Sequence, residues 1–167
     1  MSQQSLGMAL VGVFNRVFQV AEATILCGGA AEPYYEPGEP SIIYFRDDFD
    51  RSALHEVAHW CVAGSVRRGL PDYGYWYAPD GRNTQQQSAF YAVEEKPQAI
   101  EALFCEALDL TFAVSVDNLT VDANCPEIID FKAAVDRQIM RFRQRGLPDR
   151  ARRFNEALTL LAQERLG

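Results

Sequence analysis

With 167 residues, 48% of them hydrophobic and 23% charged, the chain is long enough to form one globular domain with a sizeable core. We expect a single soluble domain over residues 1–167, because no apolar run approaches the length of a membrane span. The formal net charge of −7 argues against general binding of nucleic acid and suits a cationic substrate. We therefore expect neither nucleic acid nor a membrane as a partner.

The N-terminal stretch predicts an amphipathic helix over residues 5–20, because its apolar residues recur at helical spacing. No basic segment precedes them, so we do not expect a signal peptide and we place the protein in the cytoplasm. The four cysteines are widely spaced and form no C-x-x-C pair. In a reducing compartment they are expected to be free, buried thiols.

Two short strands are predicted next. Residues 23–27, ATILC, indicate a strand that ends in a turn at Gly28 and Gly29. Residues 31–40 contain three prolines and a glycine and predict an irregular loop. Residues 41–46, SIIYFR, predict a second strand because β-branched and aromatic residues dominate them.

Residues 52–69, SALHEVAHWCVAGSVRRG, predict a helix. Asp50 or Ser52 is available as its N-cap, apolar residues follow at helical spacing, and a glycine and a proline then signal its end. Within this helix the pattern H-E-x-x-H places His55 and His59 one turn apart on the same face, where two imidazoles can share a metal ion.

The pattern alone leaves two interpretations open. Helices that bind nothing also contain H-E-x-x-H, and a buried histidine is often satisfied by a backbone carbonyl. Two histidines one turn apart, with no others in the chain, favour a metal site. A third ligand must then come from elsewhere, and it cannot be histidine.

Residues 70–87, LPDYGYWYAPDGRNTQQQ, are unusually aromatic. One interpretation is an aromatic strand on the core followed by a polar loop. The other is a pocket wall in which Tyr73, Tyr75 and Trp76, with the carboxylates of Asp72 and Asp80, receive a long cationic side chain.

A helix over residues 97–109 is predicted to begin at Pro97, a favoured first helical residue. Glu94 and Glu95 would lie just before its start, where the helix dipole stabilises a carboxylate. Glu101 and Glu106 would lie on the helix itself. Spacing alone does not choose the third metal ligand among these four glutamates.

The remaining elements are a strand over residues 111–116, a loop over 117–126 and two helices over 126–145 and 148–166. The two helices contain eight arginines, which we interpret as a solvated face paired with acids such as Asp149. A minority hypothesis is a basic docking surface for an acidic partner protein.

Three segments together resemble the bacterial elongation factor P hydroxylases. They are HEVAHWCVAG at residues 55–64, DYGYWYAPDGR at 72–82 and VEEKPQAIEALFC at 93–105. Two shorter segments, SVDNL at 115–119 and GLPDRARRF at 146–154, fit the same pattern. The first segment alone is only a metal motif, whereas the second and third are specific to this family.

The resemblance implies an activity and a fold. The family hydroxylates a lysine of elongation factor P, a tRNA-mimicking translation factor, after that lysine has received a β-lysyl group. The implied fold is an α+β domain in which a small mixed sheet packs with helices and the H-E-x-x-H helix is central. It is described as similar to a metal-dependent ribosomal-RNA endonuclease.

Carried over by motif, the resemblance implies a 2-His-1-carboxylate site for Fe(II), made by His55, His59 and Glu94, with O₂ as co-substrate. Glu56 would then orient an imidazole or relay a proton. The reductant is not indicated; if it is 2-oxoglutarate, Arg82 is a candidate partner for its distal carboxylate. Zn²⁺ or Ni²⁺ can replace Fe²⁺ in such a site during purification.

Three other classes compete with this interpretation. In a zinc metallopeptidase, Glu56 would be the general base that activates water. A metal-dependent endonuclease is suggested by the family's fold, but the acidic balance and the lack of a third histidine argue against it. A structural zinc site would normally use four closed ligands rich in cysteine.

Overall fold

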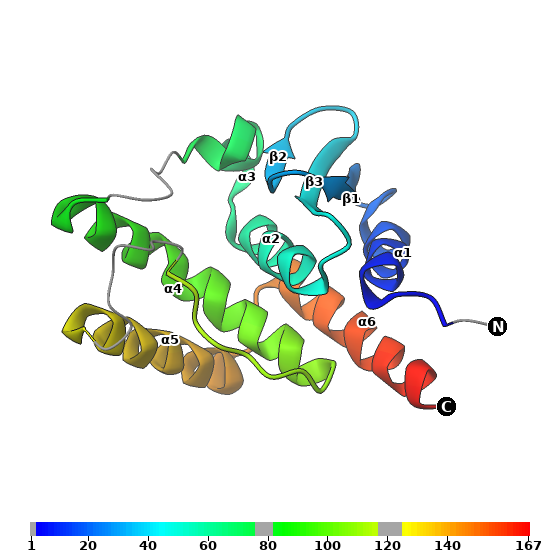
Figure 1. Ribbon diagram of the computed structural model, residues 1–167. Coiled ribbons are helices and arrows are strands. Elements are labelled where there is room, and N and C mark those ends of the chain that lie inside the picture. The colour runs from blue at the N-terminus through cyan, green and yellow to red at the C-terminus, as the bar shows by residue number, and fades with distance from the viewer. Residues whose placement is uncertain (1–2, 76–81, 117–124) are drawn as a thin grey trace.

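The computed structural model describes residues 3–75, 82–116 and 125–167. Within them a small sheet packs against a set of helices (Figure 1). In chain order the elements are α1 (Leu6–Phe18), β1 (Thr24–Ala30), β2 (Tyr34–Glu36), β3 (Ser41–Arg46), α2 (Asp50–Val62), α3 (Ser65–Arg68), the 3-10 helix η1 (Pro71–Gly74), α4 (Thr84–Ala107), α5 (Pro126–Arg145) and α6 (Asp149–Leu166).

The sheet has the strand order β1-β3-β2. β1 pairs with β3 in parallel, and β2 pairs with β3 antiparallel, so the sheet is mixed. Parallel neighbours need a crossover, and the segment from β1 through β2 to β3 supplies it. The expected α+β class with a small mixed sheet is therefore confirmed.

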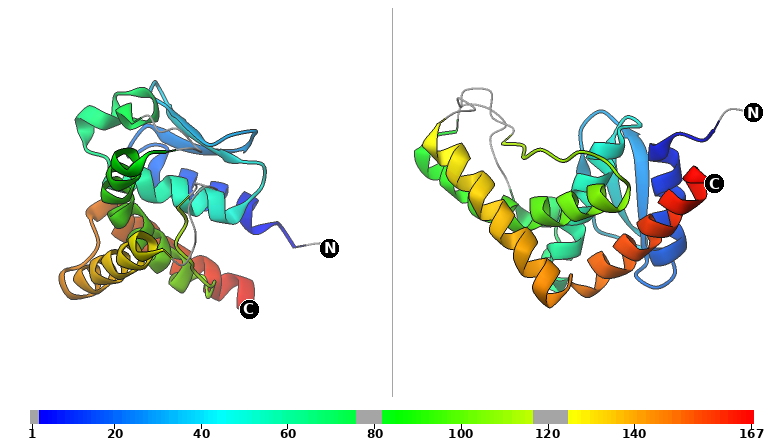
Figure 2. Two further views of the ribbon diagram at one scale, coloured as in Figure 1. Left: turned by 60° about the vertical axis from the view of Figure 1, so that its left-hand side comes forward. Right: turned by 90° about the horizontal axis from the view of Figure 1, so that it is seen from below.

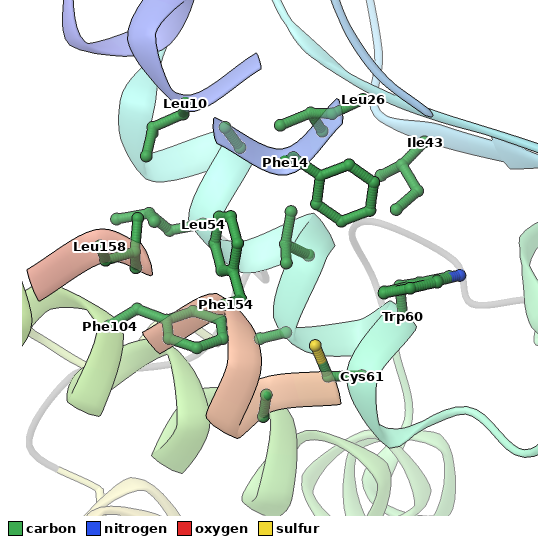
Figure 3. Close-up of a cluster of buried hydrophobic side chains, with 14 of the residues drawn as sticks. Leu10, Phe14, Leu26, Ile43, Leu54, Trp60, Cys61, Phe104, Phe154 and Leu158 are labelled. Carbon is green, nitrogen blue, oxygen red and sulfur yellow. The ribbon is translucent and has the colours of Figure 1, made fainter. Parts of the chain in front are cut away.

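Helix α2 is central to the packing. It contacts β3 on one side and α4 and α6 on the other, and Figures 1 and 2 show it between the sheet and these helices. Leu54 of α2 is fully buried among Phe14 of α1, Ile43 of β3 and Phe154 of α6 (Figure 3). Close packing holds such side chains in single positions, so α2 is a rigid support for the residues on its α4 side.

The ends of α2 differ from the prediction. The helix begins at Asp50, but neither Asp50 nor Ser52 is its N-cap. The Ser52 hydroxyl instead accepts a hydrogen bond of 3.0 Å from the Arg46 amide, which ties the helix start to the end of β3. The helix ends at Val62 because Ala63 is extended, and α3 is a separate turn.

The proline-rich loop predicted over residues 31–40 contains a strand, β2. Its central residue, Tyr35, is 1% exposed, and its ring stacks on Tyr73 at a centroid distance of 4.3 Å. The prediction was wrong because Pro33 and Pro37 limit the strand to three residues, too few for a visible alternation of apolar and polar residues.

β1 continues through Gly28 and Gly29, where the sequence predicted a turn. A Cβ at Gly28 would lie 2.8 Å from the Phe45 ring and 2.9 Å from the Asp47 carbonyl oxygen. The glycine therefore permits a close approach of the chain rather than a reversal. The register of pairing with β3 shifts at this point.

Helix α4 begins at Thr84, far ahead of the predicted start at Pro97. A capping box starts it: the Asn83 side chain accepts a hydrogen bond from the Gln86 amide at 2.8 Å, and the Gln86 side chain accepts one from the Asn83 amide at 2.9 Å. Pro97 lies inside the helix, so Glu94 is an interior helical residue and not one placed before a helix start.

Residues 111–116 were predicted as a strand but pair with no strand among the described residues. The fully buried Gln98 amide holds this extended segment instead. It donates a hydrogen bond to the Ser115 carbonyl at 2.6 Å and accepts one from the Ser115 amide at 3.0 Å. Most of the loop predicted over 117–126 lies outside the described residues.

The last two helices, α5 and α6, confirm the prediction. Arg152 forms exposed ion pairs with Asp149 and Glu156, as expected of a solvated face. Arg150 does not fit that interpretation, because its guanidinium binds backbone carbonyls at the end of α2. Among the helices described, none is long and apolar enough to cross a membrane.

Candidate metal centre

His55 and His59 project from α2 towards α4, and Glu94 of α4 meets both. The two helices pack against each other, and Figure 1 shows them side by side. The Glu94 carboxylate lies 3.4 Å from His55 Nε2 through one oxygen and 2.7 Å from His59 Nε2 through the other. One donor atom from each of the three residues lies within 4.8 Å of the others, close enough to share one metal ion.

The charges of this cluster are strongly coupled. Burial by itself raises the pKa of Glu94, but His59 and His55 outweigh it and hold that pKa far below its usual value. Burial by itself lowers the pKa of His55, and the carboxylates of Glu94 and Glu101 outweigh it and raise the pKa well above its usual value. The carboxylate is thus kept ionised, as a metal ligand must be.

Packing separates the four glutamates that the sequence left open. Glu94 is 6% exposed and faces both histidines. Glu101 binds the opposite side of the His55 ring, with its Oε1 2.6 Å from Nδ1. Glu106 is exposed and pairs with Arg143, and Glu95 is not part of the cluster.

Glu56 lies beside the cluster rather than in it. Burial raises the pKa of its carboxyl, the nearby charges of Glu94 and Asp72 raise it further, and the two histidines oppose the shift. A carboxyl in this position can hold a proton close to the two histidines and Glu94. This placement is compatible with the predicted proton relay and with the general base of a peptidase.

A cavity of about 220 Å³ opens directly beside His59. Tyr73, Tyr75 and Val93 are among its wall residues, together with Arg67 and Pro97. The Arg67 guanidinium lies over the Tyr75 ring at 3.9 Å and donates a hydrogen bond of 2.9 Å to the Tyr73 carbonyl. The described walls are therefore mostly apolar and aromatic, and of the three clustered residues His59 alone is among them.

The residues predicted to bind substrate are not gathered in one place. Tyr73 and Tyr75 line this cavity. The Asp72 carboxylate accepts a hydrogen bond of 2.9 Å from the Tyr35 amide, so it is engaged in holding η1 against β2. Trp76 and Asp80 lie outside the described residues.

Arg82 has a position of its own. Only 9% of it is exposed, its guanidinium lies over the Phe90 ring at 4.0 Å, and it donates a hydrogen bond of 2.9 Å to the Val116 carbonyl. It lines a different cavity from the one at His59. These contacts give it a structural task, holding residues 111–116 against the start of α4.

The turn that carries Asp72 and Tyr73 has an uncommon backbone. Both residues have positive φ angles, 48° and 61°, which non-glycine residues adopt rarely and at a cost. Stacking of Tyr73 on Tyr35 and the Asp72 hydrogen bond hold this conformation. It places the Tyr73 ring in the wall of the cavity beside His59.

Two features of the site escaped the sequence interpretation. Arg67 was not considered, because an arginine after a helix gives no sign that it lies over an aromatic ring. Glu101 was considered only as a ligand. Its spacing of seven residues from Glu94 places both on one face of α4. This spacing could have indicated that both carboxylates face the helix that carries the histidines.

The donor set can bind a divalent transition metal. Two imidazoles and one carboxylate on one side of an ion leave further positions for a substrate or co-substrate. That arrangement is shared by iron oxygenases and zinc hydrolases, so the donor atoms alone do not select the reaction.

Relationships to known proteins narrow the choice. Residues 13–165 match the family described as elongation factor P hydroxylase. The chain is also 42% identical over 153 residues to the elongation factor P lysine hydroxylase of Haemophilus influenzae, covering 89% of this chain and 85% of its relative. The resemblance carried by the HEVAH segment and the two segments after it is thus confirmed, and the chain belongs to the elongation factor P hydroxylase family.

Proposed function

We propose that this protein hydroxylates elongation factor P on a lysine that already carries a β-lysyl group. Membership of the family and the 42% identical relative support the reaction and the substrate protein. The observation that carries the assignment to a particular site is the cluster of His55, His59 and Glu94, with the cavity beside it. Because a translation factor is the substrate, we also propose a cytoplasmic location.

We propose Fe(II) as the resident metal, with His55 Nε2, His59 Nε2 and the Glu94 carboxylate as its ligands. The donor set fits, since two imidazoles and a carboxylate are the ligands used by non-haem iron oxygenases. When bound, iron supplies the activation of O₂ that an inert C–H bond requires. The donor of the remaining electrons is left open by these residues.

The chain's own contribution is to position the substrate and to exclude water. An extended lysyl side chain is mainly aliphatic, and the cavity beside His59 offers Tyr73, Tyr75 and Val93 as apolar walls. Stacking of Arg67 on Tyr75 fixes one wall. We propose that the substrate chain lies along these residues, with the carbon to be oxidised next to the metal ligands.

Glu56 is proposed to hold or move a proton beside this site. Its raised pKa supports the proposal, because the protonated form can donate to a group at the metal ligands. Substitution by glutamine keeps the shape and removes the exchangeable acid. Full activity of Glu56→Gln would exclude Glu56 from the reaction.

The same position of Glu56 favours one alternative, a zinc metallopeptidase in which Glu56 activates water. The family relationship argues against that function. The likeness to a metal-dependent ribosomal-RNA endonuclease remains a prediction about the fold.

The deciding experiment is mass spectrometry of β-lysylated elongation factor P after aerobic incubation with the Fe(II)-loaded protein and a reductant. A gain of one oxygen on the modified lysine is expected from the wild type and from Glu95→Gln, the matched control next to Glu94. No gain is expected from Glu94→Gln or His59→Ala. An unmodified substrate with fully Fe(II)-loaded wild type, or cleavage of peptides by the zinc-loaded form, would contradict the proposal.

A further inference from the structure

Glu101 is a buried carboxylate that the proposed metal-ligand set does not use. It lies on α4 seven residues after Glu94 and therefore on the same helix face. It is 9% exposed. Burying a carboxylate is costly unless a partner satisfies it. Among the described residues, its one ion pair is with His55, whose Nδ1 lies 2.6 Å from Glu101 Oε1.

The two ring nitrogens of His55 thus face two different carboxylates. Nε2 faces Glu94 at 3.4 Å on the metal-ligand side, and Nδ1 faces Glu101 on the other side. A neutral histidine that binds a metal through Nε2 has its proton on Nδ1. The short contact offers that N–H a carboxylate oxygen as acceptor, which fixes the tautomer and the orientation of the ring.

His59 is not supported in the same way. In the part of the chain that the structure describes, its ion pair is through Nε2 to Glu94 at 2.7 Å, and no carboxylate pairs with its Nδ1. The two histidines are therefore chemically unequal although they come from one motif. A carboxylate on the far nitrogen makes an imidazole a stronger electron donor.

We propose that Glu101 is a positioning residue that orients His55 and makes it the stronger of the two histidine donors. This inference rests on the metal site proposed above. Glu101 would act only through His55, and it would not contact the ion or the substrate. Its effect should therefore appear in metal affinity and in the spectrum of the bound ion, before any turnover takes place.

The test compares Glu101→Gln and Glu101→Ala with Glu106→Gln. Glu106 lies on the same helix, is exposed and pairs with Arg143, so Glu106→Gln is the matched control. Co(II) affinity is measured by competition with a chelator, and the visible spectrum of each Co(II) form is recorded. Circular dichroism and thermal unfolding of the metal-free forms establish that each variant is folded.

We expect Co(II) affinity to fall about 10- to 100-fold in Glu101→Ala, as for other groups that support metal-binding histidines. Glu101→Gln keeps the shape and an acceptor oxygen but loses the charge. It should lose less affinity and shift the Co(II) absorption bands, and Glu106→Gln should change neither. A merely structural role would leave the spectrum of the folded Glu101→Gln variant unchanged.

The outcomes separate this inference from the metal site itself. If the wild type binds Co(II), His59→Ala does not, and folded Glu101→Gln matches the wild type in affinity and spectrum, the role of Glu101 is refuted and the metal site stands. If wild type and His59→Ala bind Co(II) equally, the proposed metal site is refuted and the role of Glu101 with it. Should Glu101→Ala fail to fold, Glu101→Gln decides the matter.

Discussion

Replacing Arg150 with alanine should destabilise the fold far more than replacing its neighbour Arg152. Arg150 is half-buried and binds the end of α2, the helix that carries both histidines. It donates hydrogen bonds to the carbonyls of Trp60 at 2.7 Å, Cys61 at 3.3 Å and Ala63 at 2.6 Å. Its guanidinium also lies over the Trp60 ring at 4.5 Å.

The expected cost follows from these contacts. A hydrogen bond from a charged donor contributes about 1.5–3 kcal/mol when buried, a cation at a helix C-terminus about 0.3–1 kcal/mol and a cation–π contact about 0.5–2 kcal/mol. The full sum is not lost, because water can replace part of the hydrogen bonding at this half-exposed site. In addition, the Ala63 carbonyl keeps a hydrogen bond of 2.7 Å from Arg68. We therefore expect Arg150→Ala to lower the free energy of unfolding by roughly 2–4 kcal/mol. Most of this loss comes from the contacts with Trp60 and Cys61, whose carbonyls lose the Arg150 hydrogen bonds.

Arg152→Ala is the matched control. Its ion pairs with Asp149 and Glu156 are on the surface, where such pairs contribute at most about 1 kcal/mol. Urea unfolding followed by circular dichroism measures both variants. With a slope of about 1.5–2 kcal/mol per M, Arg150→Ala should lower the urea midpoint by about 1–2.7 M. Equal stabilities of the two variants, at unchanged slope, would refute the reasoning.

Three further predictions concern protons, thiols and a buried amide. The pKa of His55 is raised in the metal-free protein, so a divalent ion that binds through this histidine must displace a proton. The apparent affinity for that ion should therefore increase with pH up to the raised pKa and level off above it. Titration calorimetry in buffers of different ionisation enthalpy should detect the released proton, and a pH-independent affinity would contradict the expectation. Burial raises the pKa of Cys61 to about 12 and that of Cys105 to about 11. A thiol reagent at pH 8 should therefore react quickly with only the two half-exposed cysteines of the native protein, Cys27 and Cys125, and with all four after denaturation. Rapid reaction of all four thiols in the native protein would contradict this prediction. Gln98→Ala removes both hydrogen bonds to Ser115 and should cost about 2–3 kcal/mol while amide exchange accelerates over residues 111–116; unchanged exchange there would show that other contacts hold the segment.

Several features of this protein follow from local sequence alone. The spacing of four between His55 and His59 places them on one face of any helix, whatever surrounds it. β3 and the last two helices likewise follow from β-branched residues, helical spacing and a glycine–proline break, which act within a few residues of the chain. These local patterns were sufficient to indicate a metal site and its class of ligands.

The tertiary structure, and not the local sequence, determines which glutamate meets both histidines. Glu94, Glu95, Glu101 and Glu106 are equivalent as residue types, and only the packing of α4 on α2 turns Glu94 towards both imidazoles and Glu101 towards the far side of one. From the sequence, the helix was predicted to begin at Pro97, because proline is favoured at the first helical position. The Asn83–Gln86 capping box and the packing of α4 against α2 and α5 carry the helix through that proline instead.

The same distinction explains β2 and Arg150. A three-residue strand between prolines has too little pattern to be predicted, and it forms because β3 offers it a ladder and Tyr73 a stacking partner. The pattern of arginines on an amphipathic helix predicts a solvated face. Arg150 instead binds the end of α2, because α6 packs beside that helix. Local patterns act over a turn or a strand, and they determined which kinds of side chain form the candidate metal site. Long-range packing decided which individual residues meet there.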